Sequence, residues 1–262
     1  MRRGQHTSAL IKLLQENGYR HHLYDVFRDF VELSACALAN ACDPIGFDVR
    51  EAQYMRTVGK YNSTEVQRFP QMLGELVDAM AEEPGDVLGH VFGELEQGNA
   101  ARGQFFTPIE ICRVMAGISM DPEHVRGLIA ERGFFTVQEP AVGAGAMVIA
   151  LALHLQQHGI NYQQHMHVTC VDVDARAVHM AYVQFALLGI PAVVVLGNTL
   201  TLEQREVWHT PAHIMGLWDT KLRRGYALGS AMDADDHPLP VRAAPVVLPC
   251  AAQLDLFAEQ AA

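Results

Sequence analysis

Paired cysteines, long apolar runs and basic residues are all scarce in this sequence. Its five cysteines are scattered, with no Cys-x-x-Cys spacing, which argues against a zinc ribbon or a disulfide framework and favours a reducing compartment. No stretch approaches the roughly 20 apolar residues of a membrane-spanning helix. The N-terminal segment 1–6 is not followed by the apolar core of a signal peptide. These absences predict a cytoplasmic protein with no membrane partner.

Basic residues are outnumbered: 19 Lys and Arg stand against 30 Asp and Glu, and the formal net charge is −11. Proteins that hold duplex DNA without sequence preference usually present a basic surface to the phosphates. The charge therefore counts against a broad DNA-binding face. It leaves room for a local basic patch, so DNA stays open as a partner.

The 262 residues are enough for one full domain and a smaller one. Helical periodicity at 8–16, 24–41, 64–81 and 86–96 predicts a helical N-terminal domain over residues 1–101. We expect it to cap an α/β domain over residues 102–220. From residue 221 the composition turns basic, then acidic, then rich in spaced prolines, so residues 221–262 are predicted to form a flexible, disordered tail.

The stretch Val137–Ala150 (VQEPAVGAGAMVIA) has the pattern of a strand end, a glycine turn and a helix. Apolar runs at 134–138 and 147–155 predict a buried strand and the helix after the turn. Glycine suits such a turn because one position often needs positive φ and because a ligand must approach bare backbone. The amides that open the helix would face that ligand. An ordinary strand-to-helix turn is the alternative interpretation.

Two further apolar runs also lead to polar residues. Residues 168–172 end at Asp172, and residues 192–196 lead to Asn198. A carboxylate at the end of the second strand of a βαβ unit is placed to accept hydrogen bonds from ribose hydroxyls. Three strand ends that finish in polar residues predict one edge of a nucleoside pocket.

The segment Gly103–Pro108 (GQFFTP), followed by Glu139–Gly145 (EPAVGAG), resembles the N6-adenine DNA methyltransferases of restriction–modification systems. The helix expected at 86–96 resembles the helix that precedes the Phe-Thr-Pro segment in that family. The resemblance covers roughly residues 86–200. It implies a class I methyltransferase of α/β fold, with a Rossmann-like sheet, that uses S-adenosyl-L-methionine (SAM) as cofactor.

In that family, the Phe-Thr-Pro segment and the glycine turn hold the methionine end of SAM. The acid after the second strand holds the ribose, and a residue after the third strand reads the adenine. Matched residue by residue, the resemblance implies these cofactor-binding positions: Phe106, Thr107, Pro108, Glu139, Pro140, Ala141, Gly143, Gly145, Asp172, Val173, Asn198 and Thr199. Where the family usually has Asp, this chain has Asn198, which keeps an acceptor oxygen but loses the charge.

No metal is expected. His154 and His158 are four residues apart on one helical face, which is a spacing that metal sites use. No carboxylate or cysteine completes the set at a clear spacing. Catalytic zinc sites ordinarily need three protein ligands.

The catalytic segment of the family, Asn/Asp-Pro-Pro-Tyr/Phe, has no counterpart in the sequence. In the family it aligns the amine of a flipped-out adenine, and methyl transfer depends on that alignment. The residues after Asn198 are also too few for the other strands of a seven-stranded sheet, so we expect a truncated sheet and name no catalytic residue. Trp208 and Trp218 are interpreted as core or interface residues, the alternative being that they stack on a base.

An island of large apolar residues, QLDLF, stands in the predicted tail. It resembles the short peptide by which bacterial replication and repair proteins bind the DNA polymerase sliding clamp. A tethered peptide of this kind binds without ordering the rest of its tail. The alternative is a segment that docks on its own domain. The implied partner-binding residues are Gln253, Leu254, Asp255, Leu256 and Phe257.

These features favour a SAM-binding protein of the methyltransferase family that acts on or near DNA. It would lack a complete catalytic motif and be recruited to the clamp, as suits an accessory protein of a mobile element. The alternative is an active site-specific adenine-N6 DNA methyltransferase. Its base recognition would come from Trp208, His209 or His213, or from a partner subunit. Methylation of a small molecule or a protein has only the shared fold in its support.

Overall fold

The computed structural model describes residues 4–96 and 107–234. Its N-terminal region consists of five helices: α1 (Gln5–Asn17), α2 (Leu23–Asn40), α3 (Phe47–Val58), α4 (Ser63–Glu82) and α5 (Val87–Glu96). Four of them lie where the periodicity predicts them, and α3 was not predicted. The buried residues of α3 are only Arg50 and Thr57. Its apolar contacts with the core come from the partly buried Tyr54 and Val58, which form too short a stripe for a sequence pattern to reveal.

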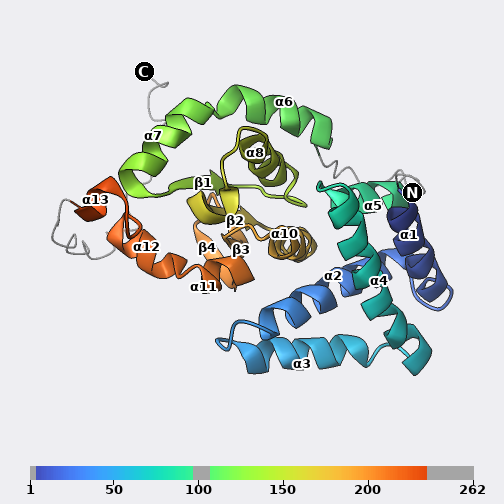
Figure 1. Cartoon of the computed structure of the whole chain (residues 1–262). Coiled ribbons are helices and arrows are strands. Elements are labelled where there is room, and N and C mark those ends of the chain that lie inside the picture. The colour runs from blue at the N-terminus through green and yellow to red at the C-terminus, as the bar shows by residue number, and fades with distance from the viewer. Residues whose placement is uncertain (1–3, 97–106, 235–262) are drawn as a thin grey trace, which may run out of the picture.

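Local signals fix where these helices begin, and apolar faces fix how they pack. Asn62 caps α4 in a capping box, in which its side chain accepts from the Glu65 N–H and the Glu65 carboxylate accepts from the Asn62 N–H. Buried apolar side chains recur along α2 at helical spacing. The helical region lies against the α/β part of the chain (Figure 1).

The α/β part is built on a four-stranded sheet of β1 (Phe135–Glu139), β2 (Met166–Asp172), β3 (Ala192–Asn198) and β4 (Glu203–His209), in that order. The first three strands are parallel, and β4 runs antiparallel to β3. The predicted α/β class and its three strands are confirmed. β4 was not predicted, because Trp208 is the only one of its residues that is fully buried and no apolar alternation marks the strand.

Helices lead into and connect the parallel strands: α6 (Ile109–Ser119), α7 (Pro122–Arg132), α8 (Ala146–Gln157), α9 (Tyr162–His165) and α10 (Ala175–Leu188). Parallel neighbours need such crossover connections, and α8 and α10 provide them. α6 packs on α8, and α10 packs on α2 of the helical region. Figure 1 shows α6 and α7 as an arc over α8.

One cluster of buried hydrophobic residues runs from the helical region into the sheet. It contains Phe27 and Phe30 of α2, Phe92 of α5 and Val168 of β2. The helical region and the sheet therefore share a hydrophobic core, as expected of a cap that is packed on the sheet.

Three short helices follow the sheet: α11 (Pro211–Met215), α12 (Trp218–Arg224) and α13 (Ala231–Ala234). The prediction of a flexible tail from residue 221 is wrong for residues 221–234. α12 continues through Lys221 to Arg224, and Trp218 and Tyr226 are buried. Two aromatic anchors hold a segment whose overall composition is that of a linker. The predicted clamp-binding residues 253–257 lie outside the described residues.

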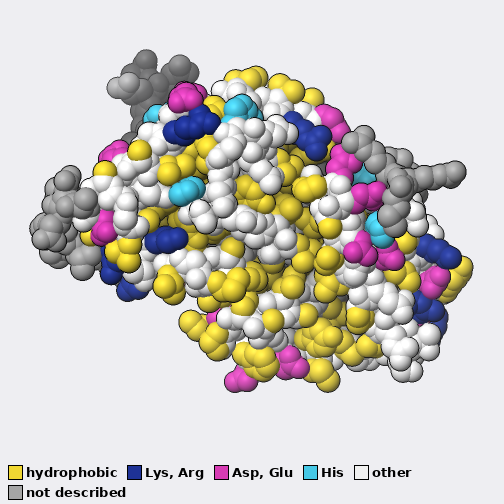
Figure 2. Space-filling model, in the orientation of Figure 1, with side chains coloured by type: hydrophobic (Ala, Val, Ile, Leu, Met, Phe, Trp, Pro, Cys, Tyr) yellow, Lys and Arg dark blue, Asp and Glu magenta, His cyan; other side chains and the backbone are white. Residues whose placement is uncertain are grey.

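No helix among the described residues is both long and apolar enough to cross a membrane. On the face seen in Figure 2, the lysine and arginine side chains are scattered rather than gathered into one patch. In the described part of that face, a DNA backbone would meet no extended basic surface, in keeping with the net charge of −11.

Candidate cofactor site

The glycine turn connects β1 to α8 at the carboxyl edge of the sheet. Gly143 and Gly145 both have positive φ, 56° and 98° respectively, a conformation that strains most other residues. Gly145 is the N-cap of α8, so the free amides of the first helical turn lie at this edge. The N–H of Val142 donates to the carbonyl of Val171 at 3.0 Å, which anchors the turn to β2.

Gly145 is also required by packing. A Cβ at this position would lie 2.6 Å from the ring of Phe185 in α10, and the residue is buried. α10 therefore presses directly on the start of α8. Of the two glycines in the turn, only Gly143 stays partly exposed and offers bare backbone to a ligand.

Asp172 ends β2 and holds the turn with its carboxylate. Oδ2 accepts from the N–H of Gly143 at 2.9 Å, and Oδ1 accepts from the N–H of Asp174 at 3.0 Å. A carboxylate oxygen has a second acceptor direction, so the half-buried Asp172 keeps capacity for a ligand hydroxyl. Asp174 instead caps α10 and forms an ion pair with Arg176 at 2.7 Å.

The end of β3 closes onto the glycine turn. The Thr199 hydroxyl donates to the carbonyl of Pro140 at 2.7 Å. The side-chain oxygen of Asn198 accepts from the N–H of Leu200 at 2.9 Å. Its amide nitrogen has no hydrogen-bond partner among the described residues. Asn198 thus presents a donor, where the sequence led us to expect an acceptor.

Glu139 and Val173 complete this edge. Oε1 of Glu139 accepts from the N–H of Ala141 at 3.2 Å, and Val173 is exposed. The structure therefore brings together nine of the predicted positions: Glu139, Pro140, Ala141, Gly143, the buried Gly145, Asp172, Val173, Asn198 and Thr199.

The other predicted positions lie beside this edge or outside the structure. Thr107 and Pro108 precede α6 and line a cavity of about 710 Å³ between the α4–α5 turn and α6. Asp86 and Arg113 line the same cavity, whereas none of the nine positions at the strand ends does, within the chain as described. Phe106 lies outside the described residues.

Sequence reasoning missed Gln184, which supports the glycine turn from behind. This side chain of α10 is buried, and its amide donates to the carbonyl of Ala144 at 2.7 Å. A buried amide must find hydrogen-bond partners. The sequence did hold a signal for this role, because a single glutamine stands between Val183 and Phe185 in an apolar helix.

The proposed base-recognising residues lie at the opposite end of the sheet. Because β4 is antiparallel, Trp208 pairs with Val194 near the start of β3. It is thus about 13 Å along the strand from Asn198, at about 3.3 Å per residue. Trp208 and Trp218 are buried, which confirms the core interpretation. His209 and His213 share this amino end, so the structure places these residues away from the edge at which SAM is predicted to bind.

Histidines at the amino end form a buried pair. Nε2 of His167 lies 2.9 Å from Nδ1 of His213, so one ring donates and the other accepts. Burial lowers the pKa of His167 to about 3, with the charge of His213 acting in the same direction. Burial also lowers the pKa of His213. Residues 4–96 and 107–234 contain no group of three metal-ligating side chains arranged to hold a metal.

Comparison with known proteins identifies the family. Residues 83–216, slightly more than half of the chain, match the model of the N-6 DNA methylase family. No curated protein matches the chain. Among solved structures, it is similar to the methyltransferase subunit of a type I restriction–modification system from Streptococcus thermophilus. The identity is 18% over 72% of this chain and 38% of that chain, with a TM-score of 0.37.

A second similar structure is a Listeria monocytogenes protein described as a class I S-adenosylmethionine-dependent methyltransferase. Its identity is 14% over 87% of this chain and 72% of that chain, with a TM-score of 0.41. This chain spans 38% of the length of the Streptococcus subunit. The match to the family model covers β1, β2, β3 and the turn that joins β1 to α8. The chain belongs to the N-6 DNA methylase family.

Proposed function

We propose that this chain binds SAM at the carboxyl edge of β1, β2 and β3, as the cofactor-binding part of an N6-adenine DNA methyltransferase. The observation that carries the proposal is the interlocking of the three strand ends. Gly143 is bonded to Asp172, and Thr199 to Pro140. These bonds place a helix N-terminus, a carboxylate with spare acceptor capacity and an exposed edge side by side.

Each strand end suits one part of the cofactor. Asp172 would accept hydrogen bonds from the ribose hydroxyls. The free amide N–H of Asn198 would donate to a ring nitrogen of adenine, and Thr107, Pro108 and Glu139 would border the methionine end. Bound SAM supplies an electrophilic methyl group on its sulfonium. The helical region would act as the cap of this domain.

Isothermal titration of the purified protein with SAM tests the proposal. We expect saturable binding by the wild type and a loss of at least about 100-fold in Glu139→Ala, Asp172→Ala, because two groups that face the cofactor are removed. Glu123→Ala on α7, an exposed carboxylate paired with Arg126, is the matched control and should bind as the wild type does. A folded wild-type protein that does not bind SAM would contradict the proposal.

We further infer that methyl transfer needs base-aligning residues from another chain, since the sequence contains no Asn/Asp-Pro-Pro-Tyr/Phe segment. The purified protein, given SAM with a labelled methyl group and adenine-containing DNA, should transfer no label. Label should appear in DNA when a partner chain that carries such a segment is added. Turnover by this chain alone would instead establish it as a complete methyltransferase.

Recruitment to the sliding clamp is proposed from the QLDLF sequence at 253–257. In a pull-down, purified clamp should capture the wild type and fail to capture Leu256→Ala, Phe257→Ala, which removes the large apolar side chains. Glu259→Ala, Gln260→Ala changes the same region outside the motif and should be captured normally. Equal capture of all three proteins would rule this recruitment out.

A further inference from the structure

The buried amide of Gln184 links the glycine turn to the N-terminal helices. Its oxygen accepts from the N–H of Leu88 at 3.0 Å. Its nitrogen donates to the carbonyl of Ala144 at 2.7 Å and to Oδ1 of Asp86 at 2.8 Å. Both amide protons and the oxygen are therefore used. The bonds fix the carboxyl group of Asp86, which precedes α5, at a set position relative to the turn.

The two carboxyl oxygens of Asp86 are in different surroundings. Oδ1 accepts from Gln184 and from the N–H of Gly89 at 2.9 Å, whereas Oδ2 has no hydrogen-bond partner among the described residues. A Cβ on Gly89 would lie 2.1 Å from Oδ2, so this carboxyl position requires glycine there. Burial raises the pKa of Asp86, against the effect of its two hydrogen bonds. A buried polar atom normally has a hydrogen-bond partner, so Oδ2 of Asp86 is free to accept from a ligand.

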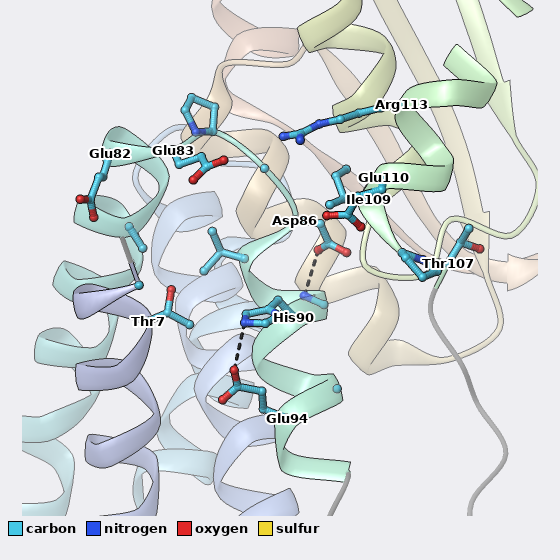
Figure 3. A pocket seen from close by; sticks show the side chains of 18 residues that line it. Thr7, Glu82, Glu83, Asp86, His90, Glu94, Thr107, Ile109, Glu110 and Arg113 are labelled. Carbon is cyan, nitrogen blue, oxygen red and sulfur yellow. Dashed lines mark hydrogen bonds and ion pairs between the residues drawn. The ribbon is translucent and has the colours of Figure 1, made fainter. Parts of the chain in front are cut away.

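Asp86 borders the cavity of about 710 Å³ that Thr107 and Pro108 also line. Figure 3 shows the Asp86 carboxyl group at the start of α5 and Arg113 extending from α6 across the cavity. Both Asp86 and Glu139 raise the pKa of the Cys112 thiol, after the larger effect of its burial. Gln184, which bonds to both Asp86 and Ala144, places the Asp86 side of the cavity next to the glycine turn.

From this arrangement we propose that Oδ2 of Asp86 accepts a hydrogen bond from the ammonium group at the amino-acid end of SAM. The inference rests on the SAM binding proposed above and adds a residue to it. The ammonium is a donor with positive charge, which an unpaired, partly buried carboxylate needs. Arg113, across the cavity, is a cation suited to the carboxylate of the same zwitterionic group.

Asp86→Asn tests this role without disturbing the bridge. Asparagine keeps an Oδ1 acceptor for Gly89 and Gln184 and replaces only Oδ2 and the charge. We expect an unchanged melting temperature and a SAM dissociation constant raised roughly ten- to hundredfold, the effect of losing one hydrogen bond to a charged group. S-adenosylhomocysteine has the same ammonium group, so its dissociation constant should rise by a similar factor in Asp86→Asn.

A ligand without the amino-acid end separates a direct contact from an indirect one. 5′-Methylthioadenosine should bind the wild type and Asp86→Asn equally. Glu82→Gln, which neutralises another carboxylate at the same cavity, should leave SAM affinity unchanged and serves as the charge control.

Equal SAM affinity of the wild type and Asp86→Asn would overturn the inference and leave the proposed function standing. A parallel loss of 5′-methylthioadenosine binding, or a lowered melting temperature, would assign Asp86 to the support of the turn and also overturn it. Absence of SAM binding by the folded wild type would overturn both proposals.

Discussion

The carboxyl end of the sheet keeps its polar side chains partly exposed, whereas the amino end buries them. At the carboxyl end, Asp172 and Asn198 are half-buried and bonded to backbone amides, and each keeps an atom for a further bond. At the amino end, His167 and His213 are buried and bonded to each other, and His167 lies beside Trp218. The two ends of one set of strands therefore differ in what they can do.

The difference separates binding from stability. Polar atoms with spare hydrogen-bonding capacity at the mouth of parallel strands can take a ligand. Fully buried rings whose partners lie inside the protein contribute to folding. Substitutions at the amino end should therefore lower the free energy of unfolding and spare SAM affinity, and those at the carboxyl end should affect SAM affinity.

The largest effect is expected from Trp218→Ala. This side chain is buried against Phe134 and His167, and Lys221 stacks over its ring at 4.2 Å. Removing a large buried ring should cost about 3–5 kcal/mol in the free energy of unfolding, measured by urea denaturation. Trp218→Phe keeps an aromatic ring and should lose less. If the folded Trp218→Ala protein binds SAM more weakly than the wild type, the two ends of the sheet are not separate in function.

Gly145→Ala should cost less, about 2–4 kcal/mol, because it combines strain at positive φ with a clash against Phe185. Gly159 follows the other end of α8 with φ 74° and nothing within 4 Å of its Cβ position. Gly159→Ala therefore isolates the backbone strain and should cost about 1 kcal/mol. Urea denaturation of both variants gives the packing contribution by difference. Equal losses would mean that α10 yields to the added methyl group.

The buried histidines should make the amino end sensitive to acid. The folded pKa of His167, about 3, lies below its unfolded value of 6.5. The unfolded state therefore binds the proton first, and stability is lost as the pH falls below 6.5. One such histidine costs about 1.4 kcal/mol between pH 7.5 and 5.5. The charges of His213, His209 and Lys221 lower the pKa of His167 further, and the charge of Asp219 raises it.

Urea denaturation of His167→Asn at pH 7.5 and 5.5 measures how much of the loss in the free energy of unfolding comes from His167. The variant should lose about 1.4 kcal/mol less than the wild type over that interval, whatever its stability at pH 7.5. His124→Asn, an exposed position on α7, is the control and should follow the wild type. If His167→Asn and the wild type show the same pH dependence, His167 does not carry the sensitivity.

Strong local patterns account for the parts of the fold that the sequence predicted. The expected helix at residues 147–155 lies within α8, because its apolar run directly follows the glycine turn that ends at Gly145. α3 and β4 escaped prediction because they bury few residues and show no apolar period. The helical segment after the sheet depends on Trp218, whose ring contacts Phe134 and His167 far away in the sequence.

The same distinction applies to the site. The strand ends at Glu139, Asp172 and Asn198 were predicted to meet because parallel strands place their carboxyl ends at one edge. The bridge from Gln184 to Asp86 joins residues 98 positions apart. No local period reports such a contact, and only the packing of α10 against α5 creates it. The donor role of Asn198 likewise depends on turn geometry after β3.

The smallest effect on stability is expected from Thr199→Val at the carboxyl end. The change removes the exposed 2.7 Å bond between the Thr199 hydroxyl and the Pro140 carbonyl, at a cost of about 0.5–1 kcal/mol in the free energy of unfolding. The loss in the free energy of SAM binding should be severalfold larger than this loss in the free energy of unfolding, because the bond holds β3 to the glycine turn. Titration with SAM and urea denaturation of the same samples give both quantities.

Two variants decide whether this bond shapes the pocket. Thr199→Ser keeps the hydroxyl and should restore SAM affinity, whereas Thr201→Val alters an exposed neighbour whose hydroxyl makes no hydrogen bond within the described chain and should change neither quantity. Suppose Thr199→Val loses stability but binds SAM as the wild type does. The contact between β3 and the turn would then belong with the buried histidines of the amino end, as a folding contact, and the pocket would rest on Asp172 and Gly143 alone.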